Sequence, residues 1–382
     1  MLLLPVLINF IYQSFSGVLV TGASGYLAMH CIQQLLQKGY EVHGTVRDLF
    51  CVEKMKPFRQ LENYERLEIF RVSLEDDVHL WEKAMRNCTY VLHIASPCEV
   101  IANETIVETA VCGTLNVLRA ASRLRCVEKI VLTSSSGAIN FKFIFNFTVL
   151  EVGHNDRDKV FTENDWTNLN WKHLHAYHKS KILAEQAAWD FMEKNLDVSF
   201  SLTVLNPSLI VGPSLQNGKR SSATIISRFL DGSMPAYPAM KLGLVDVRDV
   251  AQAHILAMKK TQTNGQRIII SAETLSFRQI ADILRQEFGK QGYSVPRFRA
   301  FYIALWLFSF VDKAASQALS LYGHVDKLDN SKSSQLLGIS YRDVRKSLIE
   351  MAYDMIERNI VPRKKNVHKK KERIELGRRF KS

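Results

Sequence analysis

Residues 18–30, "VLVTGASGYLAMH", carry the most information in this sequence. Apolar, mostly β-branched residues lead directly into Gly22 and Gly25, and a segment with helical periodicity follows. The first glycine permits a tight turn, the second lets the backbone approach a pyrophosphate, and the helix N-terminus offers N–H groups to that anion. Ala28, at the third position, still allows close packing of the helix. The stretch therefore predicts a dinucleotide-binding loop.

Outward from this loop, short β-branched runs alternate with longer helical segments as far as residue 206. The helical segments include 26–38 and 105–124, and the expected strands read "GVLVT", "EVHGTV", "LEIFRV", "YVLHIA", "KIVLTS" and "FSLTVL". Strands that alternate with helices in this way form a parallel sheet covered on both faces. We therefore predict an α/β fold for residues 17–206, a Rossmann-type doubly wound parallel sheet that binds NAD(P).

The rest of the chain has a less regular order of elements. It predicts short strands at "LGLVDV" and "QRIIIS" and helices at 248–259, at 276–288, near 300–320 and near 341–358. We expect residues 207–362 to form a smaller C-terminal substrate-binding lobe on the carboxyl edge of the sheet. Within this lobe, residues from about 242 to 258 are expected to return to the core of the first domain.

Both ends of the sequence differ from the body in composition. Residues 1–16 are an apolar extension without a basic start and too short to span a bilayer, and a secretory signal is the alternative interpretation. The first expected strand follows directly, which argues against a cleaved leader. Residues 363–382 hold ten Lys or Arg and two Glu, so they supply +8 of the net +12. We expect a basic, disordered tail, with contact to RNA or an anionic surface as the weaker hypothesis.

The cysteine and charge patterns argue against several classes of partner. All six Cys lie between residues 31 and 126, with no CxxC pair and no His cluster at metal-ligand spacing. Outside the basic tail the net charge is 12 − 8 = +4, so the folded body gives no reason to expect a specific nucleic acid partner. We expect reduced thiols, no metal and a cytoplasmic protein.

The end of the second expected strand indicates which dinucleotide is bound. In "GTVRD", Arg47 occupies the position at which NAD-binding proteins usually carry an acid for the ribose hydroxyls. A guanidinium there favours the 2′-phosphate of NADP, and Lys54 can add a second positive charge. Asp48 is adjacent, so NAD is the less favoured alternative.

A tyrosine and a lysine in "YHKSKILAEQAAW" form the expected catalytic pair. Tyr177 and Lys181 are four residues apart on a predicted helix and share one face. The ammonium favours the phenolate and lowers the tyrosine pKa from about 10 toward the working range. Tyr177 can then exchange a proton with a carbonyl oxygen as hydride moves. A serine on the neighbouring strand end would orient the same oxygen.

In the glycine loop, Arg47 and the Tyr177–Lys181 pair, the chain resembles the extended short-chain dehydrogenases/reductases. The similarity is to the dihydroflavonol reductase and cinnamoyl-CoA reductase group, within the NAD-dependent epimerase/dehydratase superfamily. It covers about residues 18–362 and rests on "VLVTGASGY", "GTVRD", "VLHIASP", "GTLNVLRAA", "VLTSSSGAIN", "YHKSKILAEQAAW", "NPSLIVGP", "VDVRDVAQAHI" and "SAETLSFRQIADILR". A homodimer is expected by analogy with the family.

The resemblance also implies roles for single residues. Ser135 would orient the carbonyl, Tyr177 would be the acid, Lys181 would activate it and bind the ribose, and Asn116 would be a supporting polar residue. The expected cofactor contacts are Gly22, Ser24, Gly25, Tyr26, Leu27, Arg47, Lys54, Ser73, Leu74, Ile94, Ala95, Ser96, Tyr177, Lys181, Pro207, Leu209 and Ile210.

Two departures from the family pattern stand out. Ser73 occupies a position near the adenine where the family usually has Asp, which should weaken one base contact. Residues 141–151, "FKFIFNFTVLE", are an apparent insertion directly after the catalytic strand end. Their bias to Phe, Ile, Asn and Lys, which have A/T-rich codons, suggests the hypothesis of translated intron sequence. A genuine apolar insertion over the pocket mouth or against a neighbour is the alternative.

Taken together, the motifs predict an NADPH-dependent oxidoreductase that reduces an aldehyde or ketone and can run in reverse. A medium-sized apolar or aromatic substrate is expected, with Tyr177 as the general acid and base. A hydroxysteroid dehydrogenase or a sugar-nucleotide epimerase with the same triad is the alternative enzyme. The non-enzymatic alternative is a protein that binds the dinucleotide but whose catalysis the insertion impairs.

Overall fold

A computed structural model describes residues 16–97, 104–140, 159–171, 174–216 and 221–364. Three predicted segments therefore lie wholly or almost wholly outside the described residues. They are the apolar extension at 1–16, the apparent insertion at 141–151 and the basic tail at 363–382.

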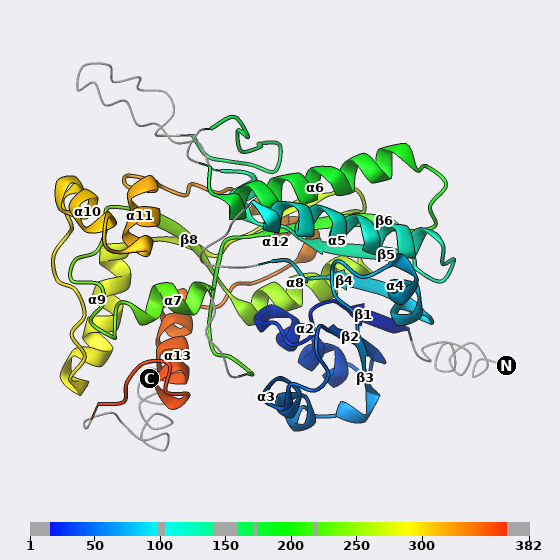
Figure 1. Cartoon of the computed structure of the whole chain (residues 1–382), viewed down its shortest axis with the longest axis horizontal. Coiled ribbons are helices and arrows are strands. Elements are labelled where there is room, and N and C mark those ends of the chain that lie inside the picture. Colours follow the sequence, from blue (N-terminus) through cyan, green and yellow to red (C-terminus); the bar gives the residue numbers. More distant parts are fainter. Residues whose placement is uncertain (1–15, 98–103, 141–158, 172–173, 217–220, 365–382) are drawn as a thin grey trace.

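A seven-stranded parallel sheet forms the centre of the molecule (Figure 1). Its strand order is β3-β2-β1-β4-β5-β6-β9, and all neighbouring strands run parallel. Strands β1 and β5 are buried along their whole length, as expected for a sheet covered on both faces. The predicted Rossmann-type fold is thus confirmed. The strands are β1 Gly17–Val20, β2 Val42–Val46, β3 Leu67–Arg71, β4 Cys88–His93, β5 Lys129–Thr133, β6 Ser201–Pro207 and β9 Arg267–Ile270.

Helices cover both faces of this sheet. In Figure 1, α4, α5 and α6 lie on one face, and α2 and α8 lie on the other. Successive residues of a strand point to opposite faces, so Leu19 packs with the first group and Val18 and Val20 pack with the second. These helices and the short α3 are α2 Tyr26–Gln37, α3 Val52–Met55, α4 Val78–Met85, α5 Thr105–Ser122, α6 Ala176–Lys194 and α8 Val247–Lys259.

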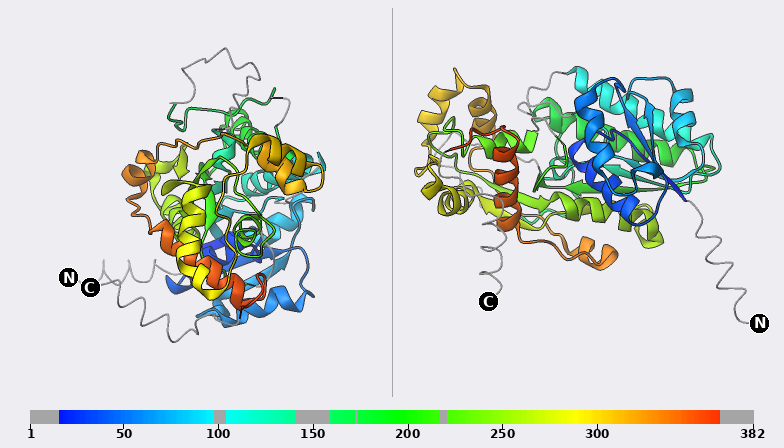
Figure 2. Two further views of the ribbon diagram at one scale, coloured as in Figure 1. Left: turned by 90° about the vertical axis from the view of Figure 1, so that its left-hand side faces the viewer. Right: turned by 90° about the horizontal axis from the view of Figure 1, so that it is seen from below.

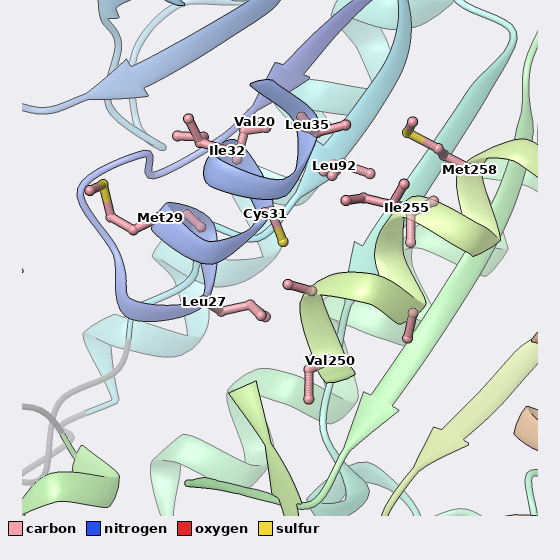
Figure 3. Packing of buried hydrophobic residues seen from close by; sticks show 14 of the residues in the cluster. Val20, Leu27, Met29, Cys31, Ile32, Leu35, Leu92, Val250, Ile255 and Met258 are labelled. Atoms are coloured by element: carbon pink, nitrogen blue, oxygen red, sulfur yellow. The ribbon is translucent and has the colours of Figure 1, made fainter. Parts of the chain in front are cut away.

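Helix α8 packs directly on α2, although more than 200 residues separate them (Figure 3). Cys31, Ile32 and Leu35 of α2 belong to the same buried cluster as Ile255 and Met258 of α8. This is the part of the chain that we expected to return to the core.

The main sheet also extends beyond the domain boundary predicted at residue 206. Strand β9 pairs with β6, although its residues were assigned to the substrate lobe. The physical reason is burial on both faces, because Ile268, Ile269 and Ile270 are all inaccessible to solvent. A strand inside a covered sheet buries consecutive side chains on both of its faces, which is the environment of these three isoleucines.

The second lobe is built on a three-stranded sheet of order β10-β8-β7. Figure 2 shows this lobe, coloured mainly yellow to red, beside the main sheet in blue to green. Its core contains Phe229, Phe277, Phe288, Leu348 and Met351. The elements are β7 Leu209–Val211, β8 Lys241–Asp246, β10 Glu273–Ser276, α7 Ser221–Ser227, α9 Phe277–Phe288, α10 Tyr302–Ser309, α11 Lys313–Ser320 and α13 Val344–Glu357. Helix α12, Ser331–Leu337, packs instead on α8 and β9 of the main sheet. Short 3₁₀ turns lie at Lys56–Gln60, Tyr64–Arg66, Ser136–Ala138, Thr261–Thr263 and Gly289–Gln291.

The single apolar helix predicted near 300–320 is wrong, because this region forms two helices. Helix α10 ends at Ser309, and Asp312 caps the start of α11, where its Oδ1 accepts a hydrogen bond from the N–H of Ala315 at 2.8 Å. The same carboxylate binds the Arg228 guanidinium, with a shortest distance of 2.7 Å. In the part of the chain that the structure describes, no helix is long and apolar enough to cross a membrane.

Candidate active site

One cavity of about 1450 Å³ runs from the start of α2 into the second lobe. Ligands of doubly wound sheets bind at the carboxyl edge where the strand order reverses, which here is between β1 and β4. The volume exceeds the roughly 300–1,000 Å³ of a typical small-molecule site, so it can hold two molecules together. Every predicted cofactor contact, from Gly22 to Ile210, lines this cavity.

The glycine loop leaves room for a phosphate close to the backbone. Gly22 has a φ of +65°, and a Cβ at this position would lie 3.0 Å from the Cβ of Ala95. A Cβ on Gly25 would lie 2.9 Å from the carbonyl oxygen of Gly22. No described side chain caps the start of α2 at Gly25, so the first N–H groups of this helix can bind an anion. These features fit a dinucleotide pyrophosphate.

A buried hydrogen-bond chain supports the wall opposite the loop. The Thr21 hydroxyl oxygen accepts from the N–H groups of Ile94, at 3.0 Å, and Ala95, at 2.9 Å, so its proton goes to Nδ1 of His93 at 3.0 Å. Nε2 of His93 then donates to the Thr114 hydroxyl at 3.4 Å. Burial lowers the pKa of His93 to about 3, so the imidazole is neutral. The chain fixes the backbone that meets the cofactor.

The charged residues after β2 lie as a 2′-phosphate would require. Arg47 and Lys54 both line the cavity and are solvent-exposed. Asp48 is not among the lining residues, and its Oδ1 accepts from the N–H of Phe50 at 2.8 Å. Ser73, at the position where an Asp was missing, lines the same end of the cavity. The arrangement fits NADP better than NAD.

The three predicted catalytic side chains lie on neighbouring elements and line the same cavity. Tyr177 is in the first turn of α6, which begins after the capping residue His175. Lys181, only 7% exposed, donates from Nζ to the carbonyl oxygen of Thr133 at 3.2 Å. Ser135 precedes the 3₁₀ turn Ser136–Ala138, and its Oγ accepts from the N–H of Gly137 at 3.1 Å. The Ser135 proton is therefore directed elsewhere and can serve a carbonyl oxygen in the cavity.

Thr133 is held at its hydroxyl as well as at its carbonyl. Nδ1 of His254 lies 2.8 Å from the Val250 carbonyl and must be the donor there, because a carbonyl only accepts. Nε2 of this ring therefore accepts from the Thr133 hydroxyl at 2.7 Å. Burial lowers the pKa of His254 to about 4, which keeps the imidazole neutral. The end of β5, where the Thr133 carbonyl accepts from Lys181, is thus hydrogen-bonded to α8.

Asn116 does not join the other proposed catalytic residues. It is not among the residues that line the cavity, and its Nδ2 donates to the carbonyl oxygens of Leu74 and Asp76, each at 3.2 Å. Its place on α5 faces the loop after β3 rather than the start of α6. Asn116 therefore supports the cofactor wall through Leu74, and its role in catalysis stays a prediction.

Two further groups near the site were missed by the sequence analysis. Glu185, one helical turn beyond Lys181, is buried and binds Ser134. The continued four-residue spacing on α6 was the available signal. His178 lines the cavity beside Tyr177, with the two rings edge to face and their centroids 5.4 Å apart. Burial, with some help from neighbouring histidines, lowers the pKa of His178 to about 3.

The far part of the cavity has a mainly apolar wall from the second lobe. Two arginines also line it, and one of them, Arg228, is bound to Asp312. The wall suits a medium-sized apolar substrate. Its larger apolar side chains include Met234, Met240, Leu242, Phe277, Leu305 and Phe308.

The fold and this site together define a Rossmann-fold oxidoreductase. A sequence profile of the NAD dependent epimerase/dehydratase family matches residues 18–271. The chain belongs to this family, and within it to the extended short-chain dehydrogenases/reductases of the dihydroflavonol reductase-like group. The predicted family is thereby confirmed.

Several known proteins are similar over most of their length. The NADPH-dependent methylglyoxal reductase of Saccharomyces cerevisiae is 30% identical over 361 residues, which cover 89% of this chain and 98% of the relative. Cinnamoyl-CoA reductase 1 of Petunia hybrida is 36% identical over 292 residues, or 74% of this chain and 81% of the relative. The crystal structure of yeast methylglyoxal/isovaleraldehyde reductase with NADPH has a TM-score of 0.71 at 28% identity and covers 89% of this chain and 98% of its own.

Proposed function

We propose that this protein is an NADPH-dependent oxidoreductase that reduces an aldehyde or ketone and can oxidise the corresponding alcohol. The observation that carries the proposal is the shared cavity, which brings Ser135, Tyr177 and Lys181 together with the glycine loop and Arg47. The similar proteins named above include an NADPH-dependent reductase and one solved with NADPH bound.

The residues of this chain supply the proton and the orientation. The nicotinamide supplies the hydride when bound. Tyr177 gives its proton to the carbonyl oxygen, and the Ser135 hydroxyl donates a hydrogen bond to the same oxygen. The Lys181 ammonium, fixed by the Thr133 carbonyl, favours the phenolate of Tyr177 and binds the ribose.

The apolar wall of the second lobe favours a medium-sized apolar or aromatic carbonyl compound as the substrate. A cytoplasmic location and a homodimer remain proposals. The domain division is also a proposal, in which a dinucleotide domain is completed by β9 and α8 and the remaining residues after 206 form the substrate lobe.

The described residues on both sides of the apparent insertion support an active enzyme rather than an impaired one. Thr167, which follows the insertion, donates from its N–H to the Ala138 carbonyl at 2.9 Å and from its hydroxyl to the Gly137 carbonyl at 2.8 Å. These bonds hold the turn that begins after Ser135. The catalytic strand end therefore keeps its supports.

Replacement of the proposed acid tests the function. We expect Tyr177→Phe to lower kcat for a panel of aldehydes and ketones by about 10²–10⁴-fold, because it removes the proton donor. NADPH binding, followed by the fluorescence of the bound cofactor, should be retained. Tyr64→Phe, at an exposed position on the 3₁₀ turn Tyr64–Arg66, is the matched control. Tight NADPH binding with equal, near-zero turnover in both wild type and Tyr177→Phe would instead support the dinucleotide-binding alternative.

A further inference from the structure

Glu185 is a buried carboxylate to which the proposed chemistry assigns no role. Glu185 is only 1% exposed. Both of its carboxylate oxygens accept hydrogen bonds. Oε2 accepts from the Ser134 hydroxyl at 2.5 Å and from Nδ2 of Asn206 at 2.9 Å. Oε1 accepts from Nε of Arg267 at 2.5 Å. The side chain on α6 thus joins the end of β5 to β6 and β9.

Asn206 connects this carboxylate to the catalytic serine. Its Nδ2, which donates to Glu185, also donates to the backbone carbonyl of Ser135 at 3.2 Å, and Asn206 is inaccessible to solvent. A carboxylate accepts hydrogen bonds but cannot donate them, so it forces the amide nitrogen to face it. The same nitrogen is thereby directed at Ser135.

Arg267 holds the carboxylate from the other side. Besides Glu185 it donates from Nη1 to the carbonyl oxygens of Glu163 at 2.6 Å and Asp165 at 2.9 Å. Its guanidinium carbon lies 3.7 Å from the ring centroid of Trp166. A buried charge is retained only when it is paired and hydrogen-bonded, and this set meets that requirement. Glu185 therefore has one defined position.

We propose that Glu185 is a positioning residue of the reductase, which acts through Asn206 on the backbone of Ser135. Glu185 also accepts a hydrogen bond from the Ser134 hydroxyl. It therefore restrains both Ser134 and, through Asn206, the backbone carbonyl of Ser135. The direction of the Ser135 hydroxyl follows from that backbone. This proposal rests on the carbonyl reductase function proposed above.

Glu185→Gln tests the link with little change in shape. Ser134, Asn206 and Arg267 all donate hydrogen bonds to the carboxylate of Glu185. The amide nitrogen of the new glutamine is itself a donor, so it must face one of these donors. Where it faces Asn206, that side chain must turn its oxygen toward the new amide and withdraw its nitrogen from the Ser135 carbonyl. We expect kcat to fall by about 10- to 100-fold, because small errors in the placement of a catalytic group cost rates of that order. The Kd of NADPH should stay within about twofold, since the glycine loop and Arg47 are not involved.

A double-mutant cycle distinguishes positioning from general destabilisation. In a Ser135→Ala background, Glu185→Gln should lower kcat by less than about twofold, because the group it positions is already absent. Trp189→Phe is the matched control. It removes a donor to Oε1 of Glu185 at 3.5 Å and leaves Oε2, which binds Ser134 and Asn206, untouched, so kcat should not change.

Several outcomes would overturn the proposal. One is an equal fold-loss of kcat on Glu185→Gln in the wild-type and the Ser135→Ala backgrounds, with kcat expressed per NADPH-binding site. Another is no loss of kcat in the wild-type background. If Glu185→Gln does not fold, Asn206→Ala replaces it in the same cycle, since it cuts the link to Ser135 and keeps Arg267 on the carboxylate. An unchanged kcat for that variant contradicts the proposal. A wild-type protein that binds NADPH but reduces no carbonyl compound contradicts the proposed function instead.

Discussion

Among single residues, we propose that Arg47 determines which dinucleotide is bound. It lines the cavity together with Lys54, while the neighbouring carboxylate of Asp48 binds the N–H of Phe50. An exposed guanidinium at this position can bind a phosphate with two parallel hydrogen bonds. A carboxylate aimed at the same place would repel it. The geometry therefore assigns the selectivity to Arg47 and gives Asp48 a role in the loop.

We expect Arg47→Ala to raise the KM for NADPH by about 10- to 100-fold, since a hydrogen bond to a charged group contributes about 1.5–3 kcal/mol. The KM for NADH should change little, because NADH lacks the 2′-phosphate. Steady-state assays with both cofactors and one carbonyl substrate measure the ratio. Asp48→Asn is the control and should leave that ratio unchanged. Equal losses with both cofactors would show that Arg47 does not bind the phosphate.

Among the elements, the strand end that carries Ser135 is supported on both sides of the apparent insertion. Before it, Nδ2 of Asn140 donates to Oδ1 of Asp326 at 2.5 Å. After it, Phe161 accepts from the N–H of Asp329 at 2.9 Å and donates to the carbonyl of Lys327 at 2.7 Å. Both flanks therefore attach to the same short segment, 326–329. Asn140 and Phe161 therefore lie near each other in the fold.

This arrangement predicts that a chain without residues 141–151 folds and is active. Seven residues, 152–158, would remain to join the two flanks, and they can span about 23–25 Å when extended. Shortening a loop changes its closure entropy only slightly. We expect kcat with NADPH within about twofold of the full chain and a similar Tm. A deletion variant that folds and binds NADPH but loses turnover would show that these residues contribute to the site.

At the scale of the whole molecule, three buried histidines are neutral. His178 lines the shared cavity, and His93 and His254 are hydrogen-bonded to Thr21 and Thr133 behind its wall. Burial lowers the pKa of His93 and His178 to about 3 and that of His254 to about 4, from an ordinary value of about 6.5. The folded protein cannot take up these protons, whereas the unfolded chain can. The contribution to stability is therefore complete above about pH 6.5 and is lost as the pH falls from there toward 4 and 3.

Acid sensitivity of folding follows from these groups. We expect the free energy of unfolding, measured with urea at pH 7, 6 and 5, to fall by several kcal/mol across this range, at about 1.4 kcal/mol per pH unit for each histidine. His93→Gln should reduce the slope by about one such increment. Identical slopes for wild type and His93→Gln would show that His93 is not protonated differently on unfolding.

The two lobes are also joined by hydrogen bonds from α2. The Tyr26 hydroxyl on α2 donates to the Gly212 carbonyl at 2.6 Å, and Nε2 of His30 lies 3.0 Å from the carbonyl of Pro213. The helix that begins at the dinucleotide loop is therefore bonded directly to the chain that follows β7. These two hydrogen bonds fix the position of the substrate lobe relative to the cofactor site.

Those features of this protein that arise from local patterns could be predicted from its sequence. The alternation of strands and helices, the glycine turn before α2 and the four-residue spacing of Tyr177 and Lys181 each arise within a few turns or strand residues. The family motifs added Ser135, which the structure places in the same cavity. Periodicity and turn chemistry report such features directly, because their physical causes act over short distances along the chain.

Contacts between residues far apart in the sequence became visible in the folded structure. It placed β9 beside β6, turned Asn116 toward the loop after β3, and divided the predicted helix near 300–320 through the pairing of Asp312 with Arg228. It also joined Glu185 to Ser134, Asn206 and Arg267. These contacts link residues up to 84 positions apart. Local sequence cannot specify them, because they depend on how strands and helices pack around a common core.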